Sequence, residues 1–241
     1  MYFSGTLFAI VCAFSFVRSG SLRPRIINGT EADQDYPWVA RILTNTEETP
    51  DGQQSLETDC GGTLIASQWV LTAKHCLLNE DLSVIGNPEK YQVIVGNNYW
   101  PGGQFIPVTD HYFYSDQSYI DDDIAMLKLE HAPKDIDPIP TQFDSLDPST
   151  YDGKKAHILG WGLTDPTKDE TITQLRETYV KLYTEGCEEN VLCFNPKDTN
   201  TNSCEGDSGG PMTMMLNEVE TMVGVTHVGQ VINKVPCSVR L

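Results

Sequence analysis

Short runs rich in β-branched and aromatic residues recur along the whole chain, and this feature limits the fold more than any other. Stretches rich in polar residues, glycine and proline separate them, as in residues 44–59 and 195–202. No long segment has the apolar period of an amphipathic helix. Many short strands with turn-rich gaps predict an all-β protein, a sandwich or a barrel. The predicted strands are Trp38–Leu43, Thr63–Thr72, Tyr91–Gly96, Phe105–Val108, Ile124–Leu129, Ala156–Gly160, Glu177–Tyr183, Pro211–Leu216 and Met222–His227.

The length of the chain limits the number of its domains, and its charge limits the possible partners. The 241 residues suffice for one large or two small domains, and no internal repeat divides them. The chain has 34 acidic and 16 basic residues, a net charge of −18. This charge disfavours nucleic acid and anionic membrane surfaces as partners, and solubility is its simplest explanation.

Residues 1–19 have the pattern of a secretory signal peptide. An apolar run from Leu7 to Val17 is followed by small and polar residues, and cleavage is predicted after Ser19. The run is too short to span a bilayer comfortably, and no later segment is a candidate span. We therefore expect a secreted, extracellular protein.

Six cysteines follow the predicted signal peptide, an even number that predicts three disulfides in an oxidising compartment. They are Cys60, Cys76, Cys187, Cys193, Cys204 and Cys237. The histidines, at positions 75, 111, 131, 157 and 227, lack zinc-site spacing, and no Cys-x-x-Cys pair occurs. No metal site and no cofactor are therefore predicted.

Ser208 stands in Gly206-Asp-Ser-Gly-Gly210, which matches the pattern G-x-S-x-G. A nucleophilic serine needs such glycines where backbone N–H groups must approach a substrate oxygen. The nucleophile elbow of α/β-hydrolases shares the pattern, but it needs a preceding strand, a following helix and triad partners downstream. Here a polar loop precedes the serine, Pro211 follows it and the chain ends at Leu241. The elbow, and with it an esterase, is the weaker interpretation.

A histidine and an aspartate upstream are candidate partners of the serine. His75 ends an apolar run beside Cys76, and Asp123 precedes the apolar segment 124–129. Each alone has an ordinary interpretation, as a structural histidine and as part of a solvated acidic loop. Their order, histidine then aspartate then serine, is one in which catalytic triads occur.

Five segments resemble the trypsin- and chymotrypsin-like family of serine proteases, in the order found there. They are RIINGTEADQDYPW (25–38), CGGTLIASQWVLTAKHC (60–76), DIAMLKL (123–129), LGWG (159–162) and SCEGDSGGP (203–211). The resemblance covers nearly the whole chain after the predicted signal. It implies that residues 26–241 form two six-stranded Greek-key β-barrels with the active site between them.

The resemblance also implies roles for the matched residues. Ser208 is expected to be the nucleophile, His75 the general base and Asp123 the residue that orients the histidine. The backbone N–H groups of Gly206 and Ser208 are expected to form the oxyanion hole.

Substrate-binding and activation residues follow from the same matching. Substrate is expected to meet Asn202, on the floor of the specificity pocket where a trypsin has aspartate, and His227 and Gly229 on a neighbouring strand. Residues 20–25 are expected to be a propeptide. Cleavage after Arg25 would free the α-amine of Ile26, which in the family pairs with the acid before the serine, here Asp207.

The disulfides implied by the resemblance are Cys60–Cys76, Cys187–Cys193 and Cys204–Cys237. The sequon Asn28-Gly-Thr30 is a candidate glycosylation site.

Several positions depart from the family pattern. Lys74 replaces a small residue beside His75, and His227-Val228 stands where members usually carry Ser-Trp. The chain stops at Leu241, where members continue into another strand and a helix. Two explanations stay open: the chain is truncated or mis-spliced, or the second barrel is incomplete or closes differently.

The resemblance predicts a secreted serine endopeptidase made as a zymogen. Its expected partners are protein or peptide substrates, an activating protease and protein protease inhibitors. The alternative is a non-catalytic protease homologue that acts as a binding or regulatory protein, which the departures at Lys74, Val228 and the C-terminus favour.

Overall fold

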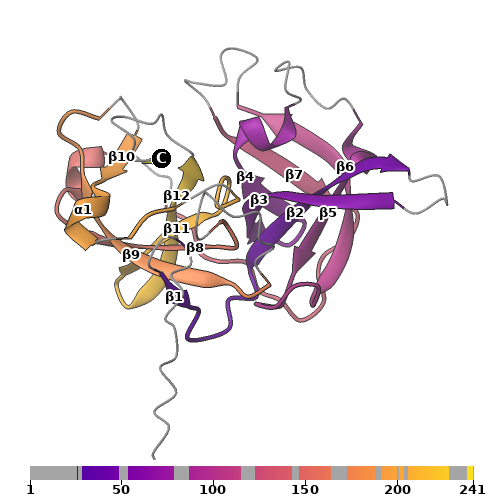
Figure 1. The fold of residues 1–241 in the computed structure, drawn as a ribbon, viewed down its shortest axis with the longest axis horizontal. Coiled ribbons are helices and arrows are strands. Elements are labelled where there is room, and N and C mark those ends of the chain that lie inside the picture. The colour runs from indigo at the N-terminus through magenta and orange to yellow at the C-terminus, as the bar shows by residue number, and fades with distance from the viewer. Residues whose placement is uncertain are drawn as a thin grey trace, which may run out of the picture.

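In the computed structural model of this chain, nearly all of the regular secondary structure is β-strand, arranged in two halves that lie side by side (Figure 1). The structure describes residues 26, 29–48, 54–78, 87–114, 123–142, 147–163, 173–187, 191–199, 201–203, 206–227 and 238–240. In this described part of the chain, no helix is long and apolar enough to cross a membrane.

The first half is a closed barrel of six antiparallel strands. Its strands follow each other around the barrel in the order β2-β3-β4-β7-β6-β5. Side chains alternate along them: in β7, Ala125, Leu127 and Leu129 are buried, whereas Met126 is exposed. This two-residue period turns one face of each strand into the barrel. The strands are β2 (Val39–Glu48), β3 (Gln54–Ala66), β4 (Trp69–Thr72), β5 (Tyr91–Val95), β6 (Gln104–Phe113) and β7 (Ala125–Leu129).

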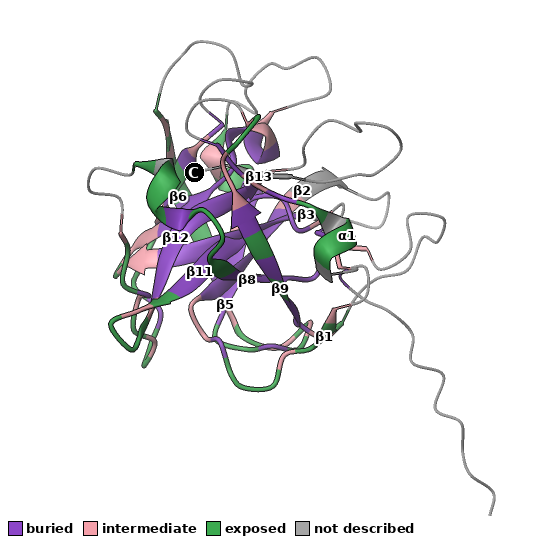
Figure 2. Cartoon of the chain, turned by 90° about the vertical axis from the view of Figure 1, so that its left-hand side faces the viewer, coloured by how far each residue is buried: buried purple, intermediate pink, exposed green. Residues whose placement is uncertain are grey.

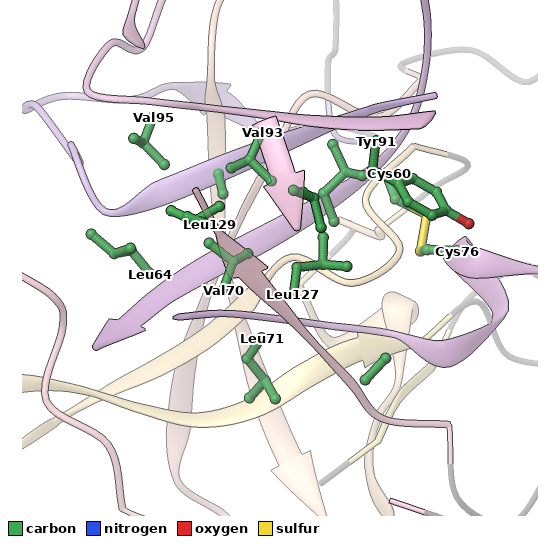
Figure 3. Close-up of a cluster of buried hydrophobic side chains, with 14 of the residues drawn as sticks. Cys60, Leu64, Val70, Leu71, Cys76, Tyr91, Val93, Val95, Leu127 and Leu129 are labelled. Atoms are coloured by element: carbon green, nitrogen blue, oxygen red, sulfur yellow. A yellow bond between two sulfur atoms is a disulfide. The ribbon is translucent and has the colours of Figure 1, made fainter. Parts of the chain in front are cut away.

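Aliphatic side chains fill the interior of this first barrel (Figure 3). Leu64, Val70, Val93 and Leu127 are completely buried there. Each such side chain stabilises the fold by roughly 1.5–3 kcal/mol relative to an exposed one. The disulfide Cys60–Cys76 lies at the edge of this cluster, so it ties β3 to the turn after β4.

The second half is a sheet in the order β1-β9-β10-β13-β12-β11-β8, and a further pairing between β8 and β9 joins its ends. Six strands are thereby connected in a ring, and β1 attaches to β9. The all-β, double-barrel fold predicted from the sequence is confirmed. The strands are β1 (Thr30–Glu31), β8 (Lys155–Gly160), β9 (Arg176–Tyr183), β10 (Val191–Phe194), β11 (Pro211–Leu216), β12 (Val219–His227) and β13 (Ser238–Arg240).

The short strand β13 completes the second ring, because it pairs with both β10 and β12. The ring of pairings is therefore closed within the described residues. Short helical turns complete the fold: η1 (Lys74–Leu77), η2 (Pro88–Lys90), η3 (Pro148–Tyr151) and α1 (Pro196–Thr199).

Strand β12 packs against both halves of the molecule. Met222 and Val225 belong to the apolar cluster of the first barrel, whereas Val223 belongs to that of the second. A β-bulge opposite Met212 and Thr213 shifts the alternation of its side chains. Figure 2 shows this strand as buried over most of its length. The end of β12, at His227, consequently lies where the two barrels meet.

Two of the sequence predictions about strands are wrong in detail. The run Thr63–Thr72 forms two strands, β3 and β4, with a turn at residues 67–68 between them. The polar stretch 44–59, predicted as a separator, lies largely in β2 and β3. Backbone pairing such as Thr44 opposite Glu57 extends that hairpin through polar residues. Strands β10 and β13 have no counterpart among the predicted runs.

The structure contains the disulfides Cys60–Cys76 and Cys187–Cys193. Cys204 and Cys237 lie outside the described residues. The segments that flank them meet at the end of β12, because the Gly209 N–H donates to the Thr226 carbonyl and Ser238 pairs with His227.

We therefore expect peptide mapping by mass spectrometry without reduction to recover Cys204 linked to Cys237. The peptides that contain Cys60–Cys76 and Cys187–Cys193 serve as internal references. An alkylated, free thiol at Cys204 or Cys237 would contradict the pairing.

Candidate active site

Backbone pairing in the first barrel brings His75 and Asp123 together. Strands β4 and β7 are antiparallel, with Thr72 opposite Ala125. The residues just after β4 and just before β7 therefore share one rim of the barrel, and these are His75 and Asp123. His75 Nδ1 lies 2.7 Å from Asp123 Oδ2, and the His75 backbone N–H donates to Asp123 Oδ1 at 2.7 Å. Both carboxylate oxygens thus hold this histidine.

The turn that carries His75 is anchored on both sides. The disulfide Cys60–Cys76 ties it to β3, and His75 Nε2 lies 3.9 Å from Cys76 Sγ. Lys74, on the other side, is buried, with its ammonium nitrogen 5.5 Å from the centre of the Phe113 ring. The apolar stem of the lysine is therefore accommodated beside the histidine, at the position where the sequence departs from the family.

A second histidine also reaches Asp123. His227 Nδ1 forms a short contact with Asp123 Oδ2, the oxygen that His75 Nδ1 also contacts. The two rings are T-shaped, with centroids 5.4 Å apart. The sequence marked His227 as a departure from serine on a substrate-binding strand, but no local pattern indicated that its side chain meets the aspartate.

The charge of Asp123 determines which ring nitrogen carries the proton in each neutral histidine. Burial of the carboxyl group by itself raises its pKa, but the hydrogen bonds from His227 and His75 outweigh burial and lower the pKa to about 2. The carboxylate is therefore ionised at neutral pH and can only accept hydrogen bonds. Each neutral imidazole must then carry its proton on Nδ1, which leaves the lone pair of His75 Nε2 available as a base.

Ser208 lies in a tight turn whose backbone favours glycine on both sides of the serine. Gly206 and Gly209 have φ values of +91° and +77°, in the left-handed region that favours glycine. A Cβ atom at Gly209 would also collide with the Thr72 hydroxyl. Replacing these glycines would therefore displace the serine.

Hydrogen bonds join the turn of Ser208 to the first barrel and to strand β12 of the second. The Thr72 hydroxyl donates to the Gly61 carbonyl at 2.9 Å, and the Gly61 N–H donates to the Ser208 carbonyl at 2.7 Å. The Gly209 N–H donates to the Thr226 carbonyl at 2.7 Å. Ser208 is thus linked to the segments that end in His75 and in His227. Among the described residues, its own hydroxyl is not hydrogen-bonded to His75.

The glycines of the LGWG segment make room for Asp207. This side chain is completely buried and accepts a hydrogen bond from the Gly162 N–H at 2.8 Å. A Cβ atom at either Gly160 or Gly162 would collide with the Asp207 carboxylate. Ile26 is also completely buried. Both expected partners of the activation step are therefore inside the protein.

The other predicted site residues are placed as follows. Asn202 is buried, with 2% of its surface exposed, and Gly206 is half-buried. Arg25, Asn28, Cys204, Gly229 and Cys237 lie outside the described residues.

Among the residues that the structure describes, two groups of side chains have the spacing of metal ligands. In His75, Asp123 and His227, one ligand atom from each lies within 4.8 Å of the others. The second group is Cys60, His75 and Cys76. Its sulfur atoms are joined in a disulfide and supply no thiolate, so this group is excluded as a metal site.

Comparisons with known proteins agree with this fold. A family model described as Trypsin matches residues 26–237. Coagulation factor XI from Bos taurus is 29% identical over 244 residues, which cover 91% of this chain and 36% of that protein. Transmembrane protease serine 5 from Homo sapiens is 26% identical over 94% of this chain and 50% of that protein. Tissue-type plasminogen activator from Mus musculus is 27% identical over 85% of this chain and 40% of that protein.

This chain spans half or less of the length of each of these relatives. The similarity thus concerns one part of each of them, and it covers most of this chain. The family match extends over both barrels. The strand pairings form the double barrel that the resemblance of this sequence to the family implied. The chain therefore belongs to the trypsin family of serine proteases.

Proposed function

We propose that this chain is a secreted serine endopeptidase, made as an inactive precursor and activated by cleavage after Arg25. The observation that carries the proposal is the buried Asp123 carboxylate, which holds His75 Nδ1 at 2.7 Å beside the turn of Ser208. A carboxylate partner alone also occurs at His157, which contacts Glu177 and Glu220, so the neighbouring serine on a glycine turn is what distinguishes His75. Among the relatives, transmembrane protease serine 5 is named as a protease and tissue-type plasminogen activator as an activator.

The proposed reaction is acyl transfer through the serine. Ser208 Oγ attacks the carbonyl carbon of the scissile peptide bond and passes its proton to His75 Nε2. The imidazolium is stabilised by Asp123 and then protonates the leaving amine, so that an acyl-enzyme forms. Water, activated by the same histidine, releases the acid. The hydrogen bond between Ser208 and His75 is expected to form with bound substrate, since such bonds are often long in its absence.

The backbone N–H groups of Gly206 and Ser208 are the proposed oxyanion hole. The left-handed φ of Gly206 lets the backbone turn so that both groups can face one substrate oxygen. Each such donor typically lowers the barrier by about 3–4 kcal/mol. Protein or peptide substrates, an activating protease and protein inhibitors are the corresponding partners.

Covalent labelling tests this proposal directly. We expect an organophosphonate serine probe to label the protein after cleavage at Arg25, and to label the uncleaved precursor far less. The labelled residue, located by peptide mass spectrometry, should be Ser208. A correctly cleaved and folded protein that takes up no label would instead indicate the non-catalytic homologue.

The residue preferred before the cut bond is a further part of the proposal. Asn202 is buried at the position where a trypsin has a carboxylate. A buried substrate cation without its counter-charge costs several kcal/mol, which corresponds to roughly a hundredfold or more in rate. We therefore expect Leu, Met or an aromatic residue to be preferred over Arg or Lys. A fluorogenic panel that varies only this residue measures the preference.

The matched variant for the panel is Asn202→Asp, which restores a carboxylate with little change of shape. It should shift the preference toward Arg and Lys. An Arg substrate that exceeds Leu and Phe by tenfold in the unaltered enzyme would contradict the assignment of Asn202.

A further inference from the structure

Three potential metal ligands meet at the junction of the barrels, although they are far apart in the sequence. His75 comes from η1, Asp123 from the residues before β7, and His227 from the end of β12. Both imidazole Nδ1 atoms face the same oxygen, Asp123 Oδ2. The three ligand atoms lie within 4.8 Å of one another.

The chemistry of this group suits a zinc-like cation. Two imidazole nitrogens and one carboxylate oxygen are ligands that Zn²⁺ takes in sites with an open fourth position. The Asp123 side chain is fully buried, whereas the side chains of His75 and His227 are 27% and 16% exposed. The group is therefore anchored at its base and reachable from solvent. The net charge of −18 also favours the approach of cations.

We propose that His75, Asp123 and His227 form a binding site for Zn²⁺ or a similar transition-metal cation, with water as the fourth ligand. The Nδ1 atoms of the two histidines and Oδ2 of the aspartate are the ligand atoms. In each imidazole the proton moves from Nδ1 to Nε2, so binding requires no net loss of protons from the histidines. The two hydrogen bonds to Asp123 Oδ2 are replaced by bonds to the metal.

The group must open before its three ligand atoms can surround a metal ion. Metal–ligand distances of about 2.0–2.1 Å in a tetrahedral site place ligand atoms roughly 3.3 Å apart. His75 Nδ1 lies 2.7 Å from Asp123 Oδ2, so this contact must lengthen by roughly 0.6 Å, and the shorter contact of His227 Nδ1 with the same oxygen must lengthen by more. The partly exposed imidazoles can supply this movement, while the buried carboxylate stays in place.

Metal binding and proteolysis would exclude each other, a consequence that rests on the proposed function, whereas the binding itself does not. With the metal on Nδ1, the proton of His75 resides on Nε2. That nitrogen then has no lone pair to accept the proton of Ser208. The carboxylate is also withdrawn from its hydrogen bond to the histidine. Zn²⁺ is therefore expected to be a reversible inhibitor.

Calorimetric titration with Zn²⁺ tests the site without relying on activity. The full chain carrying Ser208→Ala, cleaved after Arg25, is titrated without reductant, so that Cys60–Cys76 stays oxidised. His227→Asn and His227→Ser keep a donor for Asp123 but remove the imidazole ligand. We expect one Zn²⁺ per chain, and at least about a tenfold weaker affinity in both variants. Loss of a residue outside the ligand set already costs roughly 10- to 100-fold.

The matched control is His131→Ala, which removes an exposed histidine that follows β7, at the opposite end of the strand from Asp123. It should leave the affinity for Zn²⁺ unchanged. Co²⁺ in place of Zn²⁺ should give the visible absorption of a four-coordinate ion, which His227→Asn abolishes.

The outcomes separate this proposal from the proposed function. Equal Zn²⁺ affinity in the parent, His227→Asn and His227→Ser would overturn the metal site, whether or not the enzyme hydrolyses peptides. A catalytically inert protein that binds Zn²⁺ through His227 would support the site and contradict the proposed protease. An active enzyme that binds Zn²⁺ through His227 without inhibition would overturn the mutual exclusion.

Discussion

Replacing Ser208 by alanine is expected to reduce hydrolysis of a protein substrate by on the order of 10⁶-fold. The substitution removes the oxygen that attacks the peptide bond and leaves the hydrogen bonds of the surrounding backbone in place. The Ser208 carbonyl, which accepts from the Gly61 N–H, is unaffected. His75→Ala is expected to cost nearly as much, because the members of a triad act as a unit. The measurement is steady-state hydrolysis of a protein substrate by the cleaved forms.

Ser149→Ala is the control for this substitution, since Ser149 is exposed on η3, remote in sequence from the proposed nucleophile. It should retain the activity of the parent. Thermal unfolding of Ser208→Ala should match that of the parent. Full activity in Ser208→Ala would refute the assignment of the nucleophile.

Blocking the predicted activation cleavage is expected to give an inert protein. Arg25→Gln removes the basic residue before Ile26, so the α-amine of Ile26 is never freed. The physical basis is the interior position of both partners: Ile26 and Asp207 are completely buried, and Gly160 and Gly162 leave room for the carboxylate. A buried ammonium must be paired, and the Asp207 carboxylate is its expected partner. Without that pair, the oxyanion hole is expected to lack its working geometry.

Arg23→Gln is the matched control, because it removes the other arginine of the same short segment and leaves the predicted cleavage bond intact. Its protein should be cleaved and labelled by the serine probe like the parent. N-terminal sequencing of the active enzyme should begin at Ile26. Active enzyme that begins elsewhere, or an active Arg25→Gln protein, would contradict this activation step.

Local patterns were sufficient to predict most strands of the fold. The two-residue alternation of β7, with Leu127 and Leu129 directed inward, follows from the order of its residues. The polar ends of β2 and β3 could not be predicted in this way. They are strands because their backbones pair, as Thr44 does with Glu57, and backbone pairing does not depend on apolar side chains. The short strands β10 and β13 likewise exist through their pairing partners.

Some features of the candidate site could likewise be predicted from local sequence patterns, whereas others depend on contacts between distant segments. His75 and Asp123 stand at the ends of two apolar runs, and the antiparallel pairing of those runs brings them together. Gly206 and Gly209 in the sequence indicate a tight turn at Ser208. Both residues have positive φ values in the structure, which glycine adopts readily. The function of the LGWG glycines was not visible in the sequence, because the group that needs their space, Asp207, lies 45 residues away.

The sequence by itself determined the all-β class, the family resemblance that implied two barrels, and the residues that carry the proposed chemistry. These properties depend on strand periodicity and on short motifs, in which each residue constrains its neighbours. Only the tertiary structure decided that His227 shares Asp123 with His75. Asp123 and His227 are 104 residues apart and belong to different barrels. Their contact depends on the packing of β12 against both halves. A local pattern of residues does not determine how close two segments from different barrels lie.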